Sequence, residues 1–148
     1  MGEPELLGTL PARLYAICAL LLVLKMLALA SYTSSLRMRK KIYASPEDYT
    51  FQGQSPVQRS DAEIERARRA HRNDLENVLP FLAVAPIYVS TGPSEAGAWL
   101  CFVGFTTARI LHTVFYVREA MPHRTIAYAA GFFLTLWMVF ASGWALLR

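Results

Sequence analysis

The stretch RARRAHRNDLENVLPFLAVAPIYVS, residues 66–90, places a dense group of polar residues directly before an apolar run. If this stretch is one helix, four polar residues recur at i, i+3, i+4 and i+7, the spacing that puts side chains on one helical face: Arg69, Arg72, Asn73 and Glu76. The apolar run that follows, residues 77–90, is too short to cross a bilayer alone, since a crossing needs about 20 residues. Part of the polar face therefore lies at membrane depth.

Ionisable side chains at that depth are costly. An ionisable group within a bilayer costs at least about 3 kcal/mol unless it faces a bundle interior or a water-filled cavity. We therefore interpret Arg72, Asn73 and Glu76 as a candidate site rather than as ordinary solvated surface residues.

Three further apolar stretches surround this one. Residues 14–36 contain a single charge, Lys25; residues 96–117 contain only Arg109; residues 125–147 have no charge. The sequence thus predicts an all-α, four-helix membrane bundle forming one domain over residues 1–148, with spans at about 13–36, 66–90, 96–117 and 124–147. Because Glu3 and Glu5 precede it and its apolar run is long, we do not expect the first span to be a cleaved signal.

The net charge of +4 comes from basic residues beside the predicted spans, at residues 37–41 and 66–72. Such juxtamembrane clusters are typical of membrane orientation and of contact with anionic lipid, so we expect no nucleic-acid partner. The loop at residues 37–65 is predicted to be cytoplasmic, with both termini on the opposite side. Cys18 and Cys101 lie within apolar runs, where cysteine acts as a small hydrophobic residue, so neither a disulfide nor a metal site is expected.

Local signals add detail to this plan. Lys25 is expected to pair with a carboxylate or carbonyl between helices. The sequence Ser60-Asp61-Ala62-Glu63 has the form of a capping box, which indicates that the second long helix begins there. Pro80 and Pro86 lie inside that helix, where they free backbone carbonyls near Glu76 and Leu82.

Two further polar lines occur near the predicted cytoplasmic ends of the last two spans. Arg109, His112 and Tyr116 recur at i, i+3 and i+7, and Arg124 and Thr125 precede Tyr128. Several arginines facing one obvious carboxylate make an electropositive pocket, which suits a ligand bearing carboxylates and favours the thiolate form of a thiol ligand. The alternative is that Arg69, Arg109 and Glu76 only pair with other charges and lock the helices together.

Three segments carry a resemblance to a known family. ERARRAHRNDLENVLPF (residues 65–81), RMRKKIYASPED (residues 37–48) and ARILHTVFY (residues 108–116) resemble the membrane-associated proteins in eicosanoid and glutathione metabolism, the MAPEG family. The resemblance is closest to the branch that holds microsomal glutathione transferases and prostaglandin-forming isomerases. It implies a homotrimer of four-helix subunits that binds glutathione between neighbouring subunits.

The resemblance also implies roles for individual residues. The positions similar to the family's glutathione contacts are Arg37, Arg72, Asn73, Glu76, His112, Tyr116, Arg124, Thr125 and Tyr128. By that likeness the arginines bind the carboxylates of the tripeptide, Glu76 binds its amine, and Arg124 with Thr125 contacts the sulfur. By the same likeness, Asp48 matches a loop carboxylate of the family that is implied in proton transfer.

The function expected from the sequence is that of a membrane-bound, glutathione-dependent enzyme of the endoplasmic reticulum. It would stabilise the glutathione thiolate and transfer it to lipophilic electrophiles, with reduction of lipid peroxides as a possible addition. The first alternative is the isomerisation of prostaglandin H2 to E2; others are a non-catalytic lipid-binding scaffold and a proton or ion pathway.

Overall fold

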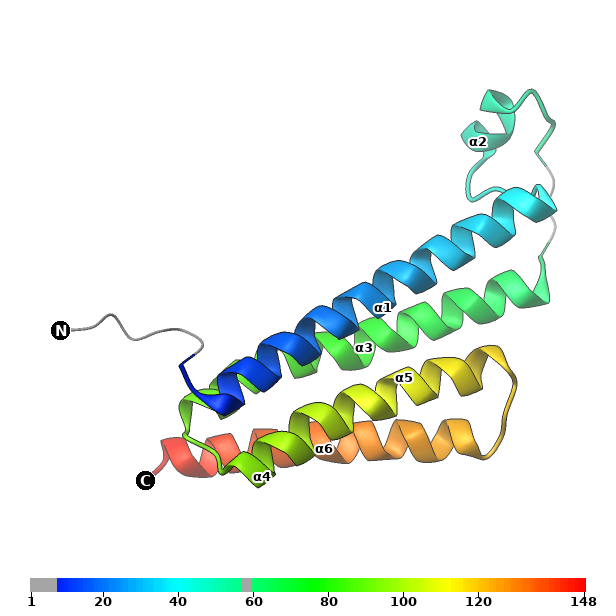
Figure 1. The fold of residues 1–148 in the computed structure, drawn as a ribbon. Coiled ribbons are helices and arrows are strands. Elements are labelled where there is room, and N and C mark those ends of the chain that lie inside the picture. The colour runs from blue at the N-terminus through cyan, green and yellow to red at the C-terminus, as the bar shows by residue number, and fades with distance from the viewer. Residues whose placement is uncertain (1–7, 57–59) are drawn as a thin grey trace.

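All regular structure in residues 8–56 and 60–148, the part of the chain described by this computed structural model, is helical. Helix α1 (Leu10–Lys40) packs along α3 (Ala62–Ser90), and α5 (Gly104–Val117) packs along α6 (His123–Leu146) (Figure 1). Helix α4 (Glu95–Ala98) and the π-helical segment η1 (Trp99–Val103) lead directly into α5. The prediction of an all-α fold is confirmed.

The helices run back and forth along one axis. The start of α1 and the end of α6 lie at one end of the bundle, whereas the link between α5 and α6 lies at the other (Figure 1). The short helix α2 (Pro46–Phe51) stands beyond the end of α1, away from the packed helices. The polar ends of α1, α3, α5 and α6 therefore meet at the end that carries α2.

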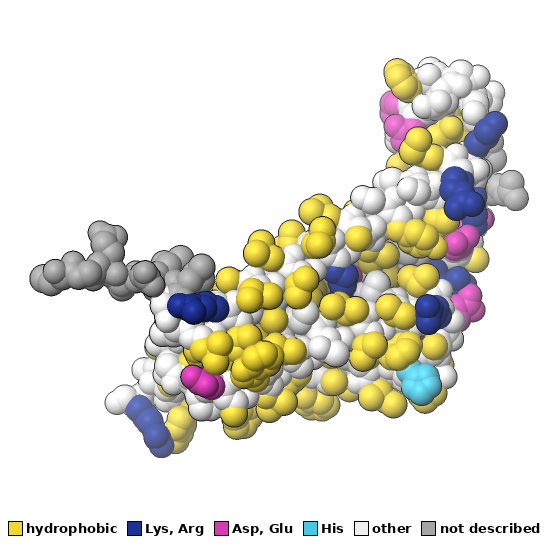
Figure 2. Space-filling view, in the orientation of Figure 1, with side chains coloured by type: hydrophobic (Ala, Val, Ile, Leu, Met, Phe, Trp, Pro, Cys, Tyr) yellow, Lys and Arg dark blue, Asp and Glu magenta, His cyan; other side chains and the backbone are white. Residues whose placement is uncertain are grey.

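Three segments are long and apolar enough to cross a membrane: Leu10–Lys40, Glu95–Val117 and His123–Leu146. Helix α3 is not among them, because its first half is rich in charged residues, from Glu63 to Glu76. Figure 2 shows hydrophobic side chains spread over the visible face of the bundle, with most charged side chains near its ends. Large exposed apolar residues such as Leu20, Phe133 and Phe140 suit a surface in contact with lipid.

Helix α3 begins one residue later than the capping-box pattern predicted. Its N-cap is Asp61 rather than Ser60, and the Asp61 carboxylate accepts hydrogen bonds from the backbone N–H groups of Glu63 (3.0 Å) and Ile64 (3.2 Å). A carboxylate also complements the positive end of the helix dipole, which a serine hydroxyl does less well. The aspartate therefore takes the capping position.

The carbonyl released by Pro86 has a partner on another helix. Because proline lacks an N–H, the Leu82 carbonyl four residues earlier loses its helical donor. The Tyr15 hydroxyl on α1 donates to that oxygen at 3.3 Å. The predicted free carbonyl near Leu82 thus becomes a contact between α1 and α3.

An aromatic core joins all the long helices in the half of the bundle away from α2. Phe81 on α3 and Phe105 on α5 stack in parallel with ring centroids 4.2 Å apart, and Phe102 meets Phe81 edge-on at 6.2 Å. Cys18 and Cys101 are buried free thiols in the same core, in agreement with their predicted role as small hydrophobic residues. This packing fixes the rotation of α3 and α5, and so fixes which of their polar residues face inward.

Candidate functional site

A buried polar network crosses the bundle between α1, α3 and α5. Its centre is Asp74, a fully buried carboxylate that accepts from the Lys25 ammonium at 2.6 Å and from the Arg109 guanidinium at 3.2 Å. Thr113 Oγ1 accepts from Lys25 at 2.9 Å and lies 3.4 Å from Asp74 Oδ2. The predicted pairing of Lys25 with a carboxylate between helices is confirmed.

Arg109 is also fully buried and links two predicted ligand-binding residues. Its Nη2 atom donates to Asn73 Oδ1 at 2.6 Å and lies 3.3 Å from His112 Nδ1. Its Nε and Nη1 atoms are buried without a hydrogen-bond partner among the described residues. We call the residues joined in this way the Arg109 network: Lys25, Asn73, Asp74, Arg109, His112 and Thr113.

The Arg109 network carries an excess of positive charge. Two cations, Lys25 and Arg109, face one carboxylate, Asp74, and none of the three is more than slightly exposed. Electrostatic interactions are strong in such a low-dielectric environment. The potential around His112, at the edge of this network, therefore favours an anionic ligand.

Beside His112 lies a group of aromatic rings and one arginine, which we call the Arg124 cluster: His112, Tyr116, Arg124 and Tyr128. The His112 ring centroid is 5.6 Å from that of Tyr116 and 6.0 Å from that of Tyr128. The Arg124 guanidinium lies 4.6 Å above the Tyr116 ring, in cation–π geometry. The structure thus brings together four of the predicted glutathione-contacting residues, from α5 and α6.

Other predicted residues lie elsewhere on the chain. Arg37 on α1 and Arg72 on α3 line a cavity of about 360 Å³ that also contains His71, whose Nδ1 atom is buried and has no partner among the residues described. Glu76 lines a separate cavity of about 160 Å³ between α3 and α6. Within one chain the predicted site residues therefore lie in three groups: the Arg124 cluster, the cavity lined by Arg37 and Arg72, and the cavity lined by Glu76.

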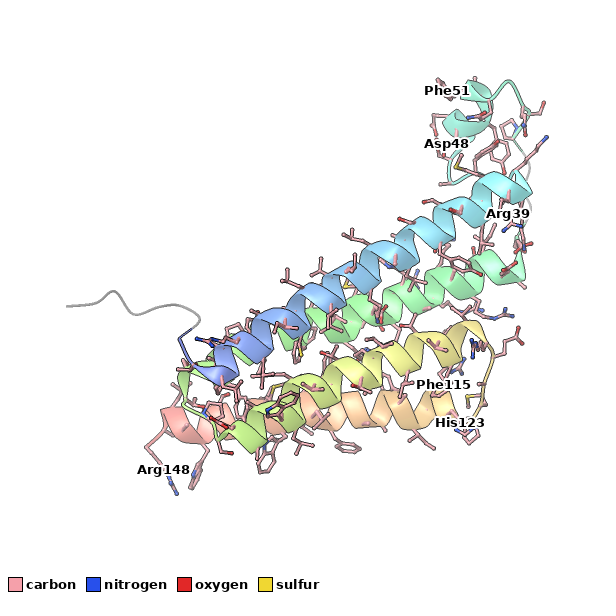
Figure 3. The ribbon with its side chains drawn as sticks, viewed as in Figure 1. Arg39, Asp48, Phe51, Phe115, His123 and Arg148 are labelled. Atoms are coloured by element: carbon pink, nitrogen blue, oxygen red, sulfur yellow. The ribbon has the colours of Figure 1, made fainter. Side chains whose placement is uncertain are left out.

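Two predicted catalytic residues sit on the surface. Thr125 is exposed, and its hydroxyl lies 3.6 Å from the Met121 sulfur. Asp48 is exposed on α2, where its carboxylate accepts from the Ser45 backbone N–H at 3.1 Å and completes a capping box. Figure 3 shows Asp48 on α2, well away from the α5–α6 link that His123 marks. Within a single chain, Asp48 is a helix-capping residue.

Asp74 and Thr113 belong to the network but were not among the site residues predicted from the sequence. A signal for Asp74 was present, because it begins the series Asp74, Val78, Phe81 and Ala85, whose i, i+4, i+7 and i+11 spacing marks the buried face of α3. A carboxylate on an otherwise apolar buried face needs a cationic partner. Lys25 and Arg109, the isolated charges of two other spans, were the available partners.

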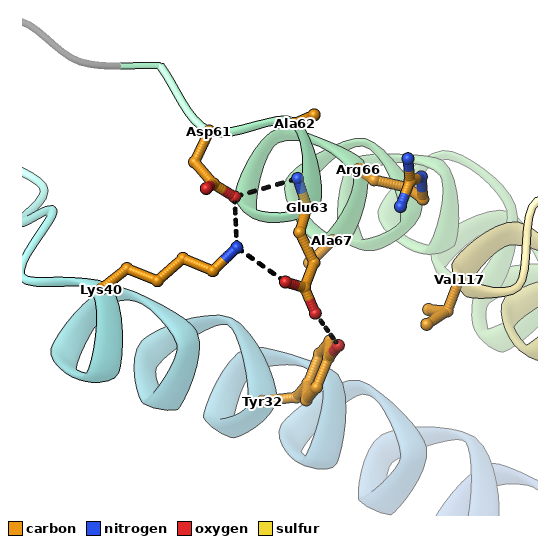
Figure 4. Close-up of a pocket in the computed structure, with 8 residues that line it drawn as sticks. All are labelled: Tyr32, Lys40, Asp61, Ala62, Glu63, Arg66, Ala67 and Val117. Carbon is orange, nitrogen blue, oxygen red and sulfur yellow. Dashed lines mark hydrogen bonds and ion pairs between the residues drawn. The ribbon is translucent and has the colours of Figure 1, made fainter.

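A second polar group, the Lys40 cluster (Tyr32, Lys40, Asp61 and Glu63), joins the end of α1 to the start of α3 (Figure 4). The Lys40 ammonium donates to Asp61 at 2.8 Å and to Glu63 at 2.7 Å, and the Tyr32 hydroxyl donates to Glu63 at 3.0 Å. The hydrogen bonds from Lys40 hold the pKa of both carboxyls below their ordinary values, and the two carboxylates raise the pKa of Lys40. The cluster fastens the ends of α1 and α3 across the intervening loop.

The structure therefore combines helices long and apolar enough to cross a membrane with a buried cationic network and, beside it, the partly aromatic Arg124 cluster near the α5–α6 link. Comparison with known proteins agrees, because the sequence model of the MAPEG family matches residues 15–144. The chain belongs to the MAPEG family.

The relatives that it matches are named as enzymes. The prostaglandin E synthase of Mus musculus is 43% identical over 76% of this chain and 72% of its own length. The prostaglandin E synthase of Rattus norvegicus is 40% identical over 91% of this chain and 88% of its own length. The microsomal glutathione S-transferase 1 of Homo sapiens is 36% identical over 85% of this chain and 84% of its own length. The resemblance stated from the sequence is confirmed.

Proposed function

We propose that this protein is a membrane-bound, glutathione-dependent enzyme, a glutathione S-transferase that acts on lipophilic electrophiles. Membership of the MAPEG family and relatives named as a glutathione S-transferase and as prostaglandin E synthases support this class. The observation that carries the proposal is the Arg124 cluster beside the Arg109 network, where Arg124 lies over the Tyr116 ring next to a buried site of net positive charge.

The residues present fit glutathione. The tripeptide has two carboxylates and an amine, and the chain offers Arg37 and Arg72 in one cavity, an exposed carboxylate at Glu76, and the cationic Arg124 cluster. Guanidinium groups bind carboxylates through paired hydrogen bonds. When bound, glutathione supplies a thiol whose anionic form is a strong nucleophile.

Each predicted site residue has a defined role in this proposal. Arg37 and Arg72 bind carboxylates, Glu76 binds the amine, and Asn73, His112, Tyr116 and Tyr128 orient the peptide. Arg124 and the Thr125 hydroxyl lie at the sulfur, where a nearby guanidinium favours the thiolate over the thiol. Asp48 would act in proton transfer only from a neighbouring subunit or after movement of the loop that carries α2.

We also propose that the site is completed by assembly into a homotrimer. Arg72 and Glu76 are exposed on one face of α3, and that face continues through Leu79 and Ala83 into the apolar half of the helix. Charged groups at membrane depth are costly when they face lipid. Contact with α3 and α6 of neighbouring copies would cover this face and would bring the three groups of site residues toward one another.

This assembly implies a topology and a location. Helix α3 would be a fourth membrane span, shielded by its neighbours, beside the three helices that are apolar enough to cross on their own. The loop at residues 37–65 would face the cytoplasm, and the endoplasmic reticulum membrane would hold the enzyme and its lipophilic substrate. No nucleic-acid partner belongs to this proposal.

A second candidate function is the glutathione-dependent isomerisation of prostaglandin H2 to E2. Identities of 40–43% with rodent prostaglandin E synthases, against 36% with the human transferase, favour it. The same thiolate would attack the endoperoxide and would be regenerated at the end of the cycle, so the site residues would keep their tasks.

The test is a titration of the purified protein, in detergent or lipid, with glutathione, while the near-ultraviolet absorbance of the thiolate is recorded. Wild type should show saturable thiolate formation, and Arg124→Gln should reduce it by about tenfold or more. Arg148→Gln is the matched control, because Arg148 makes a similar cation–π contact with Trp144 at the far end of the same helix.

Absence of thiolate with wild type at saturating glutathione would contradict both enzymatic candidates and leave a lipid-binding scaffold. Turnover of an aryl halide compared with turnover of an endoperoxide then separates the transferase from the isomerase. Proton or ion flux in liposomes without glutathione would support the remaining alternative, an ion pathway.

A further inference from the structure

The contacts of Arg109 determine which atoms of its neighbours face it. A guanidinium group is always a hydrogen-bond donor and never an acceptor. Its Nη2 atom lies 2.6 Å from the Asn73 side chain and 3.3 Å from the Nδ1 atom of the His112 ring. Any hydrogen bond from Arg109 to these neighbours must therefore end on an acceptor atom of Asn73 or His112.

For Asn73 the acceptor is the amide oxygen Oδ1. The two ends of an amide side chain differ only in that one accepts and the other donates, so an obligate donor at 2.6 Å fixes the orientation. The amide nitrogen Nδ2 then points away from Arg109, and it donates to no atom of the described residues. Asn73 thus offers two free N–H groups.

For His112 the atom that faces Arg109, at 3.3 Å, is Nδ1, and a hydrogen bond between the two requires that Nδ1 carry no proton. In a neutral imidazole the proton is then on Nε2. The rings of Tyr116 and Tyr128 also face the imidazole. No hydrogen bond joins Nε2 to any residue that the structure describes. His112 therefore also offers an N–H group.

Arg109 itself is held on several sides. Its Nη2 atom lies 3.2 Å from Asp74 Oδ1 and 3.4 Å from the Asn73 carbonyl oxygen, and Lys25 binds the same carboxylate. The backbone of Gly131 on α6 lies against its aliphatic part, since a Cβ atom at that position would be 3.3 Å from Arg109 Cδ. The guanidinium therefore has little freedom to release either neighbour.

We propose that Arg109 is a positioning residue that fixes Asn73 and His112 as a pair of hydrogen-bond donors, so that this part of the site receives carboxylate or carbonyl oxygens of the ligand. Asp74 and Lys25 hold Arg109 in that position. The inference rests on the proposed function for the nature of the ligand, but the orientation of both side chains follows from the contacts of the free protein.

The direct test is nuclear magnetic resonance of protein labelled with nitrogen-15 at histidine, above pH 7 and without glutathione. The chain has three histidines, so the His112 signals are assigned by their loss in His112→Gln. Wild type should show a protonated Nε2 and an unprotonated Nδ1, and Arg109→Lys should shift His112 toward a mixture of the two tautomers. A protonated Nδ1 in wild type would overturn the inference, and so would an unchanged tautomer in Arg109→Lys.

The functional arm measures glutathione affinity and turnover. Arg109→Lys should raise the Kd for glutathione about tenfold or more, because lysine keeps the charge but cannot hold both neighbours. The kcat at saturating glutathione should fall less than the affinity, since the proposed function places the sulfur at Arg124 and Thr125 rather than at Arg109. The matched control is Arg118→Lys, an exposed arginine at the end of α5 that should leave the Kd unchanged.

The two arms separate the two ideas. If wild type binds no glutathione, the proposed function fails, while the tautomer measurement still decides the role of Arg109. If glutathione binds but His112 carries its proton on Nδ1, the proposed function stands and the positioning role is wrong. An unchanged Kd in folded Arg109→Lys would also contradict the positioning role.

Discussion

The Asp74 carboxylate on α3 accepts from the Lys25 ammonium on α1 at 2.6 Å, and this ion pair lies within the bundle. Asp74 also pairs with Arg109, so one carboxylate balances two cations, Lys25 and Arg109. Asp74→Asn would leave two buried cations unpaired, whereas Lys25→Met would leave a balanced pair of Asp74 and Arg109. We therefore expect Asp74→Asn to destabilise the fold by about 3–5 kcal/mol, and Lys25→Met to cost clearly less.

The measurement is denaturant unfolding of the purified protein in detergent, followed by helical circular dichroism. Lys41→Met is the control for loss of a lysine, because Lys41 is exposed and follows the last residue of α1. Equal destabilisation by Asp74→Asn and Lys25→Met would mean that the excess cation is compensated by a group outside the Arg109 network.

The close packing of Gly131 against Arg109 gives a second prediction. A Cβ atom at position 131 would lie 3.3 Å from Arg109 Cδ and 3.7 Å from the Phe105 ring, and Arg109 is held too firmly to move aside. Gly131→Ala should therefore destabilise the protein by about 1–3 kcal/mol, the usual cost of overpacking. It should also raise the Kd for glutathione by disturbing Asn73 and His112.

The same helix supplies the control for that substitution. A Cβ atom at Gly143 would meet nothing within 4 Å, so Gly143→Ala gains helix propensity without a clash. We expect it to be neutral or to stabilise the protein by up to about 1 kcal/mol. Thermal unfolding of both variants measures the difference. Equal unfolding temperatures for Gly131→Ala and Gly143→Ala would show that Arg109 is free to move.

The long helices of this protein could be predicted from its sequence because each has its own signal, whereas the short helix α2 was not predicted. Apolar runs marked α1, the segment from α4 to α5, and α6, and polar spacing followed by an apolar run marked α3. The partner of Lys25 could be predicted as a class of group, because an isolated buried charge requires one. Its identity, Asp74, depends on the rotation of α3 against α1, which the pattern of a single helix does not specify.

Which of the predicted site residues on α3 face the bundle interior could not be predicted from the sequence. Helical spacing placed Arg72, Asn73 and Glu76 on one face, yet Asn73 turns inward to Arg109 while Arg72 and Glu76 are exposed. Residues one position apart on a helix differ by about 100° in direction, so a broad polar face divides between two environments. Which part faces the bundle is decided by packing of the aromatic core.

The Lys40 cluster gives a prediction about pH. Hydrogen bonds from Lys40 lower the pKa of Asp61 and Glu63 from ordinary values of 3.8 and 4.5. Carboxyls with lowered pKa contribute stability above their ordinary pKa and lose it as the pH falls through the lowered value. The pKa of Lys40 is raised above 10.5, so its contribution is complete below that pH and is lost only in stronger alkali.

The contact between the ends of α1 and α3 should therefore be stable between about pH 5 and pH 10 and should loosen toward pH 3. Hydrogen-exchange protection of the first amides of α3, including Glu63 and Ile64, measures this directly. Lys40→Met should lower their protection near neutral pH, with Lys41→Met as the control. Equal protection in Lys40→Met and wild type would show that Asp61 caps α3 without help from Lys40.

The exposed face of α3 gives a test of the proposed assembly. Ala83 is exposed on the same face as Arg72 and Glu76, in the apolar half of the helix. If that face meets a neighbouring copy, Ala83→Trp should prevent close approach and lower the fraction of assembled protein. Glutathione affinity should fall with it, by about tenfold or more, because the site would lose residues from the neighbour.

Native mass spectrometry in detergent, with glutathione titration of the same samples, measures both effects. The matched control is Ala145→Trp, an exposed position near the end of α6, which should leave assembly and affinity unchanged. Should Ala83→Trp assemble like wild type, this face of α3 would be free of close contacts. The charges at Arg72 and Glu76 would then need a water-filled cavity in place of a neighbouring subunit, since neither lies stably against lipid.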